Sequence, residues 1–309
     1  MAEKIHIALV ANDRYRPGLE CTKVSMIRAC AEPERLVFHE YGDKDMAPFL
    51  AQMESELRDF YGSGSKLTYL RLFLPDLLLD CDWVLYADVD TLWFRDPCEL
   101  WELRDESKSV CWVRDLEVAQ IETGWWAKEK GLPNVRKDKY ACAGIALINL
   151  KRWREKDFIG RMRTFLKAYG CPLHHDQDIM NFLLENDLRM IGEEWNTMIP
   201  PRKWRPCVLH ITGIGRRLNG SDRYDGNVPQ YVFWFNYWRR YLLALPPMKL
   251  SWTLKGRFAF LVLLSWTIGP LLDLADKFPG GYAWKMAIMR LRRQLGWARF
   301  GLGFCPASR

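Results

Sequence analysis

Two acidic residues, separated by one residue, follow an apolar stretch of the chain. The stretch is Trp83–Ala87 (WVLYA), and Asp88 and Asp90 come directly after it. In an extended backbone the side chains of residues i and i+2 point to the same side, so both carboxylates can meet one divalent cation. On its own such a pair is more often two solvated surface acids. At the end of a buried strand, however, it predicts a metal site where the cation would bridge two phosphate groups.

Apolar segments alternate with helical patterns along the first 245 residues. The segments expected as strands are 4–11, 36–40, 83–87, 144–149 and 208–211. The segments expected as helices are 18–29, 46–60, 68–78, 151–169 and 176–185. This alternation favours an α/β fold with an open, largely parallel sheet, whose ligands bind at the carboxyl ends of the strands. The acidic pair would lie at that edge.

The basic residues are unevenly distributed along the chain, whose net charge is +7. Residues 246–309 contain ten Lys or Arg and two Asp or Glu, a balance of +8, which leaves residues 1–245 at −1. A nucleic-acid groove in the main body would need a basic surface there. The distribution therefore argues against nucleic acid as a partner and indicates a separate tail over residues 246–309.

The tail contains a pattern typical of an amphipathic helix at residues 282–300. Its apolar face consists of Trp284, Ile288, Leu291, Leu295 and Ala298, and its basic residues are Lys285, Arg290, Arg292, Arg293 and Arg299. Such a helix lies in the plane of a membrane surface beside anionic lipid. The alternative is a helix that packs on the main domain. The apolar run 258–275 is about one bilayer crossing long, but Gly269-Pro270 and Asp273 interrupt it, so we expect peripheral association rather than a spanning helix.

The cysteines and the first residues indicate a cytoplasmic protein. Nine cysteines are spread along the chain without a C-x-x-C pair, which suggests neither a zinc site nor a disulfide framework. The segment MAEKIHIALVAND has no apolar region of the length that a signal peptide needs. We therefore expect reduced thiols and a cytoplasmic location. Together with the tail, this predicts a protein on the inner face of a membrane.

Short motifs, dispersed along the chain, occur in a fixed order. They are Lys66–Leu72, Leu85–Asp90, Ala143–Leu150, Asp176–Asp178 and His210–Gly213. In this order they resemble the family 8 glycosyltransferases, the retaining GT-A group that contains glycogenin and bacterial lipopolysaccharide glucosyl- and galactosyltransferases. Several matches in order are more specific than any one motif. The resemblance covers residues 4–220 and implies a GT-A-like, Rossmann-like fold with a mixed, mostly parallel sheet. We therefore expect one such domain over residues 1–245, followed by the C-terminal amphipathic helical tail that the charge and hydropathy patterns indicate.

The resemblance implies a metal site and a donor site. Asp88 and Asp90 match the manganese-binding D-x-D, and His210 matches the third protein ligand, although a lone histidine in a strand is more often a satisfied structural residue. For the donor, a UDP-sugar, the positions implied are Ala11, Asn12, Tyr15, Arg71, Gly213 and Arg216. Mn²⁺ is expected, with Mg²⁺ as the alternative.

The resemblance also implies the residues nearest the reaction. Asp176 matches a carboxylate that contacts the donor sugar, and the amide of Gln177 matches a group near the anomeric carbon. Two positions depart from the family pattern. Arg216 replaces a lysine at the diphosphate, and Cys142 replaces an asparagine that often precedes Ala-Gly, so the identity of the donor sugar does not carry over.

The sequence thus predicts a retaining, Mn-dependent hexosyltransferase that moves a sugar from a UDP-sugar to a lipid-linked or cell-envelope glycan, as in lipopolysaccharide biosynthesis. Trp125 and Trp126 could form an acceptor-stacking surface, or a packed aromatic pair. Two other classes stay open. A nucleotidyltransferase could use a similar crevice with a nucleoside triphosphate, and a non-catalytic protein could bind the nucleotide-sugar without turning it over.

Overall fold

A six-stranded mixed sheet forms the centre of the computed structural model, which describes residues 2–13, 15–56, 66–115, 118–198 and 207–210. In sheet order the strands are β2 (Leu36–Tyr41), β1 (Ile5–Val10), β3 (Trp83–Ala87), β6 (Ala141–Asn149), β5 (Val110–Arg114) and β7 (Leu188–Ile191). A second, two-stranded sheet pairs β4 (Thr91–Trp93) with β8 (Val208–His210). All described residues belong to one compact unit, Met1–His210.

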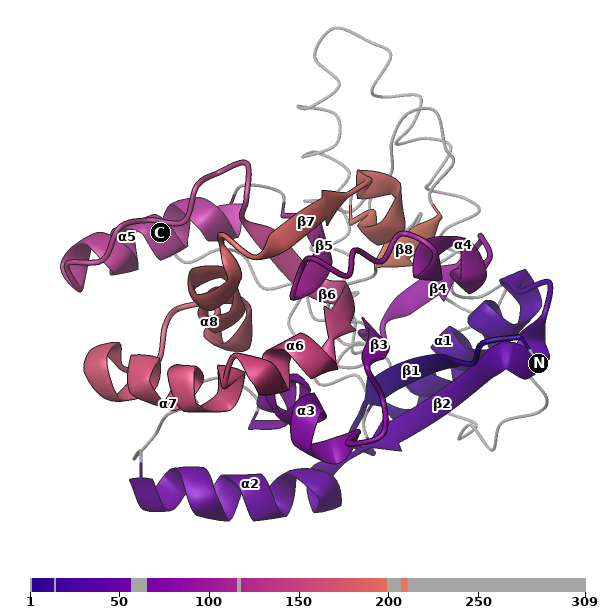
Figure 1. Ribbon diagram of the computed structural model, residues 1–309, viewed down its shortest axis with the longest axis horizontal. Helices are drawn as coiled ribbons and strands as arrows, with labels where there is room; N and C mark the ends of the chain where they lie inside the picture. The colour runs from indigo at the N-terminus through magenta and orange to yellow at the C-terminus, as the bar shows by residue number, and fades with distance from the viewer. Residues whose placement is uncertain (1, 14, 57–65, 116–117, 199–206, 211–309) are drawn as a thin grey trace, which may run out of the picture. The chain divides into compact units, whose positions relative to one another are not determined.

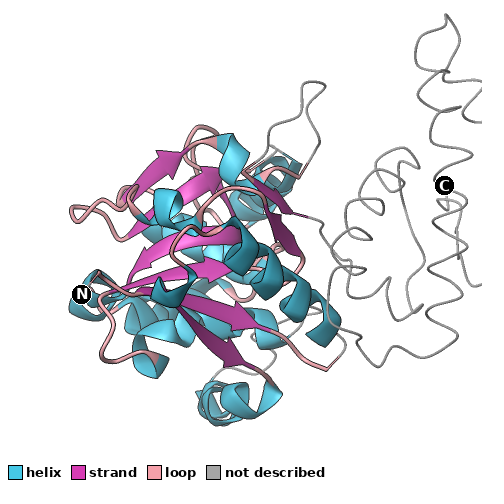
Figure 2. Ribbon diagram, turned by 90° about the vertical axis from the view of Figure 1, so that its right-hand side faces the viewer, coloured by secondary structure: helices cyan, strands magenta, loops and turns pink. Residues whose placement is uncertain are grey.

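Helices cover both faces of the large sheet (Figure 1), and in Figure 2 the strands lie between them. The α-helices are α1 (Arg16–Ala29), α2 (Asp43–Glu56), α3 (Leu74–Leu77), α4 (Pro97–Trp101), α5 (Val118–Glu129), α6 (Leu150–Glu155), α7 (Phe158–Tyr169) and α8 (His175–Leu184). Three 3-10 helices are η1 (Pro33–Arg35), η2 (Lys66–Phe73) and η3 (Glu193–Asn196).

The sheet is mostly parallel, as the alternation of segments predicts. β1 pairs in parallel with β2 and β3, and β5 with β7, whereas β6 runs antiparallel to both of its neighbours. All nine residues of β6 are buried, because this strand has neighbours on both edges and helices or loops on both faces. Because β1 and β3 are parallel, both end at the same edge of the sheet, and Asp88 follows β3 there.

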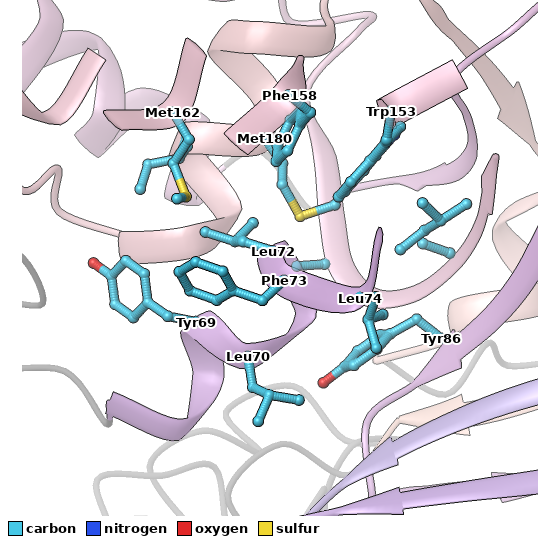
Figure 3. Packing of buried hydrophobic residues seen from close by; sticks show 14 of the residues in the cluster. Tyr69, Leu70, Leu72, Phe73, Leu74, Tyr86, Trp153, Phe158, Met162 and Met180 are labelled. Atoms are coloured by element: carbon cyan, nitrogen blue, oxygen red, sulfur yellow. The ribbon is translucent and has the colours of Figure 1, made fainter. Parts of the chain in front are cut away.

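Two hydrophobic clusters, one on each face, hold the sheet in place. Alternate residues of a strand point to opposite faces, so Val84 and Tyr86 belong to one cluster and Leu85 and Ala87 to the other. Figure 3 shows the first cluster, in which side chains from η2 and α3 pack beside residues of α6, α7 and α8. The indole of Trp153 stacks on the ring of Phe158 with 3.9 Å between centroids.

Several predicted helices differ from those observed. The segment expected as one helix over 151–169 is two, because Asp157 adopts a left-handed conformation (φ 46°) and its side chain caps α7 through the amide of Gly160. The expected helix over 68–78 is mostly the 3-10 helix η2, followed by one turn of α3. β4, β5 and β7 were not predicted, because β4 and β7 are short and β5, buried over most of its length, lacks the alternation of a half-buried strand.

The predicted tail, including the apolar run 258–275, lies outside the described residues, and so the boundary at residue 245 stays a prediction. Within the part of the chain that the structure describes, no helix combines the length and the hydropathy that a membrane crossing requires.

A carboxylate network joins the far edge of the sheet to α6. Asp187 precedes β7 and accepts hydrogen bonds from the hydroxyl of Ser109 and from Lys156, the latter at 2.5 Å. The guanidinium of Arg152 lies 3.3 Å from its other oxygen. Burial alone would raise the pKa of Asp187, but these donors lower it below its ordinary value.

Asp187→Asn should lower the free energy of unfolding by about 1–2 kcal/mol at pH 7, because the charged acceptor is lost. The folded-state pKa of Asp187 is depressed, so its contribution is complete above the unfolded value of about 3.9 and is lost as the pH falls through the folded value. The difference between variant and wild type should therefore shrink below about pH 4. Urea unfolding across pH measures it, with the exposed Asp80→Asn as a matched control.

Candidate active site

Asp88 and Asp90 lie in a turn between β3 and β4, at the carboxyl edge of the large sheet. The amide of Asp88 donates to the carbonyl of Gly144 at 2.8 Å, and the hydroxyl of Thr91 donates to the carbonyl of Asp88 at 2.8 Å. The expectation of an extended Asp88-Val89-Asp90 backbone is therefore wrong. The two carboxylates converge because the chain turns, and not because the residues alternate along a strand.

His210 joins the two carboxylates from a distant part of the chain. It pairs with Thr91 across the β4–β8 sheet, which places its Nε2 3.2 Å from Asp90 Oδ1 and 3.6 Å from Asp88 Oδ2. One ligand atom from each of the three residues lies within 4.8 Å of the others, and His210 and Asp90 are buried. Two carboxylate oxygens and one imidazole nitrogen are a donor set that fits a divalent cation such as Mn²⁺.

The orientation of the His210 ring is set by Asn196, in η3. His210 Nδ1 lies 2.9 Å from Asn196 Oδ1, and because an amide oxygen only accepts hydrogen bonds, Nδ1 carries the hydrogen. Nε2 then turns its lone pair toward the carboxylates, as a metal ligand requires. Burial lowers the pKa of His210, but Asp90 raises it, and the result is well above the usual range. Without a bound cation Asp90 therefore favours the protonated ring, and a metal at Nε2 would take the place of that proton.

Gly144 makes room for the His210 ring. A Cβ atom at this position would lie 2.3 Å from His210 Cε1 and 2.5 Å from Nδ1, far inside van der Waals contact. The Ala-Gly of the motif in β6 therefore has a steric reason, because the imidazole lies directly against the strand backbone. A larger residue would displace the ring from Asp88 and Asp90.

Gly144→Ala should destabilise the protein by about 1–3 kcal/mol, as overpacking does in other cores. If the clash with His210 is the cause, the same substitution should cost at least about 1 kcal/mol less in a His210→Ala background. Urea unfolding of the wild type, both single variants and the double variant closes this cycle. Equal costs in the two backgrounds would place the strain somewhere other than the imidazole.

Arg71 connects the acidic pair to α8. Its guanidinium lies 3.0 Å from Asp88 Oδ1 and 2.9 Å from Asp176 Oδ2, and it donates to the carbonyl of Ala143 at 2.6 Å. It also lies over the ring of Tyr86, 4.3 Å from the centroid, and the Tyr86 hydroxyl donates to Asp88 Oδ1 at 2.7 Å. Burial would lower the pKa of Arg71, but the two carboxylates raise it, so the side chain stays charged.

A bulge in the sheet supplies the backbone groups that α8 binds. The pairing of β5 with β6 shifts between Trp112 and Val113, which leaves Ala143 without a partner in β5. The amide of Ala143 donates instead to Gln177 Oε1 at 2.9 Å, and the carbonyl of Ala143 accepts a hydrogen bond from Arg71. Asn181, one helical turn further, binds both the amide and the carbonyl of Ala141. The bulge therefore positions the Asp176–Asp178 motif against β6.

Each acidic residue of this motif has a different environment. Asp176 is buried beside Arg71; burial raises its pKa above the ordinary value, while the guanidinium acts in the opposite direction. Asp178 is fully buried and accepts hydrogen bonds from Thr123 at 2.6 Å and from Tyr140 at 2.5 Å. The Gln177 amide nitrogen lies 3.3 Å from Asp115 Oδ2 and 3.2 Å from the Tyr140 hydroxyl. Asp178 therefore orients the start of α8 from within the core.

The predicted donor positions are only partly within the described residues. Ala11 follows β1, where its amide donates to the carbonyl of Tyr41, and Asn12 accepts hydrogen bonds from the amide of Tyr15 ahead of α1. Because β1 and β3 are parallel neighbours, with Leu9 opposite Ala87, this segment starts at the same sheet edge as Asp88. Gly213 and Arg216 lie outside the described residues.

Other residues near the site were not assigned from the sequence. Asn196, Tyr140 and Asp115 act through contacts between separate elements and belong to no recognisable spacing pattern. Tyr86 lies within the Leu85–Asp90 motif, but its hydrogen bond to Asp88 was not expected. Cys142 is buried in β6, next to Ala143. Of the aromatic pair in α5, Trp126 is packed against Phe165 and Phe182, whereas Trp125 is 68% exposed.

The comparison with protein families decides the classification. The model of "Glycosyl transferase family 8" matches residues 24–214, which is more than half of the chain. The chain belongs to glycosyltransferase family 8. The match contains the acidic pair, α8 and His210, and leaves out the predicted positions at the end of β1 and Arg216.

Curated relatives of this family 8 chain include sugar transferases. It is 30% identical to lipopolysaccharide 1,3-galactosyltransferase of Salmonella typhimurium over 137 residues, and this alignment covers 42% of the chain and 39% of the relative. It is 25% identical over 228 residues to glucoside xylosyltransferase 1 of Rattus norvegicus, which covers 63% and 52%. The chain thus spans less than two thirds of the length of these relatives.

Solved structures show the same fold. The galactosyltransferase LgtC, in complex with donor and acceptor sugar analogues, aligns with a TM-score of 0.59 and 21% identity over 80% of this chain and 99% of that one. The bifunctional glycosyltransferase WbbM aligns with a TM-score of 0.52 and 19% identity over 69% of this chain and 46% of that one. The predicted GT-A-like α/β fold of the catalytic domain is therefore confirmed.

Proposed function

We propose that this family 8 chain is a retaining glycosyltransferase that transfers a hexose from a UDP-sugar to a lipid-linked or cell-envelope glycan, with Mn²⁺ as its cofactor. The observation that carries the proposal is the convergence of Asp88, Asp90 and His210 at the carboxyl edge of the sheet. In open α/β sheets ligands bind at this edge. The activities for which two relatives are named, galactosyl and xylosyl transfer, belong to the same reaction class.

The chemistry requires a stabilised leaving group. Transfer from a UDP-sugar releases a nucleoside diphosphate, whose negative charge grows as the glycosidic bond breaks. A divalent cation held by Asp88, Asp90 and His210 would neutralise part of that charge. The protein contributes rigid ligands: Arg71 and Tyr86 fix Asp88, and Asn196 fixes His210. From its sequence position, Arg216 would supply a second positive charge to the diphosphate.

The sugar left behind carries positive charge at its anomeric carbon, and an anion or dipole nearby stabilises it. Asp176 and Gln177 are proposed for this role. Asp176 lies in an ion pair with Arg71 at 2.9 Å, which makes its carboxylate less available as a nucleophile. We therefore propose departure and attack on one face of the sugar. A glycosyl adduct on Asp176 in the mass spectrum of quenched enzyme would instead establish double displacement.

The donor and the metal are tested together. The purified full-length chain should release UDP from one UDP-sugar of a panel that also contains GDP- and ADP-sugars, and only with Mn²⁺ or Mg²⁺ present. Asp90→Ala should reduce this release about 100-fold or more, because the charge stabilisation at the leaving group is lost. Asp80→Ala, at an exposed position, is the matched control and should keep full activity.

Other products of this assay would replace the proposal. Release of pyrophosphate from a nucleoside triphosphate would identify a nucleotidyltransferase. Tight binding of a UDP-sugar without turnover, even when glycolipid acceptors are added, would identify a binding protein. Unchanged turnover in Asp90→Ala would remove Asp90 from the metal site.

We also propose that residues 246–309 hold the enzyme on the cytoplasmic face of a membrane, where lipid-linked acceptors are located. The support is the basic, amphipathic pattern of 282–300. The full-length chain should co-sediment with vesicles that contain anionic lipid, and high salt should release it. Replacing Arg290, Arg292 and Arg293 by Gln should abolish binding, whereas the same change at Lys128, Lys130 and Lys151 in the catalytic domain should not. Equal binding of the two triple variants would contradict the tail as the anchor.

A further inference from the structure

A second group of metal-binding side chains lies away from the acidic pair. His6 of β1, His39 of β2 and Cys81, just before β3, each offer one ligand atom, and these atoms lie within 4.8 Å of one another. His6 Nδ1 is 2.9 Å from His39 Nε2, and the two rings stack with 5.2 Å between centroids. The length of β3, about 17 Å, separates Cys81 from Asp88, so the two groups are distinct sites.

The topology explains how three distant positions in the sequence meet. β1 lies between β2 and β3 in the sheet, and its register places Ala8 opposite His39 and His6 opposite Val37. His6 and His39 are therefore diagonal neighbours, on adjacent strands. The segment that leads into β3 brings Cys81 beside them, and there its carbonyl accepts a hydrogen bond from Arg154 at 2.9 Å.

Two of the three donor atoms are spaced nearly as a tetrahedral site requires, and the third lies within 4.8 Å of both. Zn–N bonds of about 2.0–2.1 Å and Zn–S bonds of about 2.3 Å require neighbouring ligand atoms roughly 3.3–3.6 Å apart. The two imidazole nitrogens are already near this separation, and a small rotation of either ring would complete it. Both histidines are partly exposed, so a cation can reach them from solvent, and the fourth position is left for water.

We propose that His6, His39 and Cys81 bind one Zn²⁺, which would join β1 and the edge strand β2 to the start of β3. A thiolate with two imidazoles is a soft donor set that selects Zn²⁺, whereas Asp88, Asp90 and His210 form a harder set suited to Mn²⁺. Imidazole binds zinc in its neutral form and cysteine binds it as the thiolate, so metal binding at this group would release protons. On binding, the Cys81 thiol loses its proton to solvent, and the resulting thiolate sulfur coordinates the Zn²⁺.

The test uses Co²⁺, a spectroscopic substitute for Zn²⁺, with the full-length chain. Titration of the reduced protein should give a thiolate-to-cobalt charge-transfer band that saturates at one equivalent, and Zn²⁺ but not Mn²⁺ should abolish it. Cys81→Ser should eliminate the band, and His39→Gln should weaken Co²⁺ binding at least about tenfold. Circular dichroism shows whether each variant is folded. If Cys81→Ser does not fold, the loss of Co²⁺ affinity in His39→Gln still tests the site.

Two controls make the result specific. Cys98→Ser removes a thiol from the other cysteine cluster among the described residues, where Cys98 Sγ lies 3.6 Å from Cys30 Sγ, and it should leave the band intact. Asp90→Ala should also keep the band, so failure of this site and failure of the proposed transferase activity are distinguishable. No thiolate band in the wild type, or a band that persists in Cys81→Ser, would overturn the proposal and leave a hydrogen-bonded histidine pair.

Discussion

The buried guanidinium of Arg71 is the interaction on which the rest of the site depends. It joins three parts of the chain, because Asp88 follows β3, Asp176 begins α8 and Ala143 belongs to β6. A buried charge is tolerated only when its partners satisfy it, and removal of one partner from such a pair typically costs about 3–5 kcal/mol. Arg71 lies in η2, most of whose residues are buried, so the packing of this segment in the core holds the guanidinium where the three parts of the chain meet.

The second constraint is the irregularity of the sheet. A regular β5–β6 ladder would use the amide and carbonyl of Ala143 within the sheet, and neither Gln177 nor Arg71 would have a backbone partner there. The bulge releases these groups at the carboxyl edge, beside Asp88. The next residue of the same strand, Gly144, has no side chain and so leaves room for the His210 ring. One short segment of β6 thus sets the positions of the acidic pair, the histidine and α8 together.

The protein keeps two kinds of donor group apart. The hard oxygen ligands Asp88 and Asp90 follow β3, at the edge where a nucleotide would bind, and the softer group of His6, His39 and Cys81 precedes it. Ligand softness and preferred geometry separate the metals that two such sites select. The absence of a C-x-x-C pair in the sequence gave no indication of the second group, because its three residues meet only through the pairing of adjacent strands.

The sequence by itself determined the family, the α/β class and most strands, because ordered motifs and apolar segments are local features. It also predicted Asp88 and Asp90 as metal ligands from their type and spacing, and His210 from the family resemblance, and the structure brings the three side chains together. Only the tertiary structure decided how they converge: the acidic pair turns instead of extending, and β8 returns His210 to β4. The role of Asn196 and the reason for Gly144 depend on contacts between separate elements of the fold, and Tyr86, which binds the nearby Asp88, also lies under the guanidinium of Arg71 from η2. No local pattern encodes such contacts, because they arise from how strands and helices pack in three dimensions.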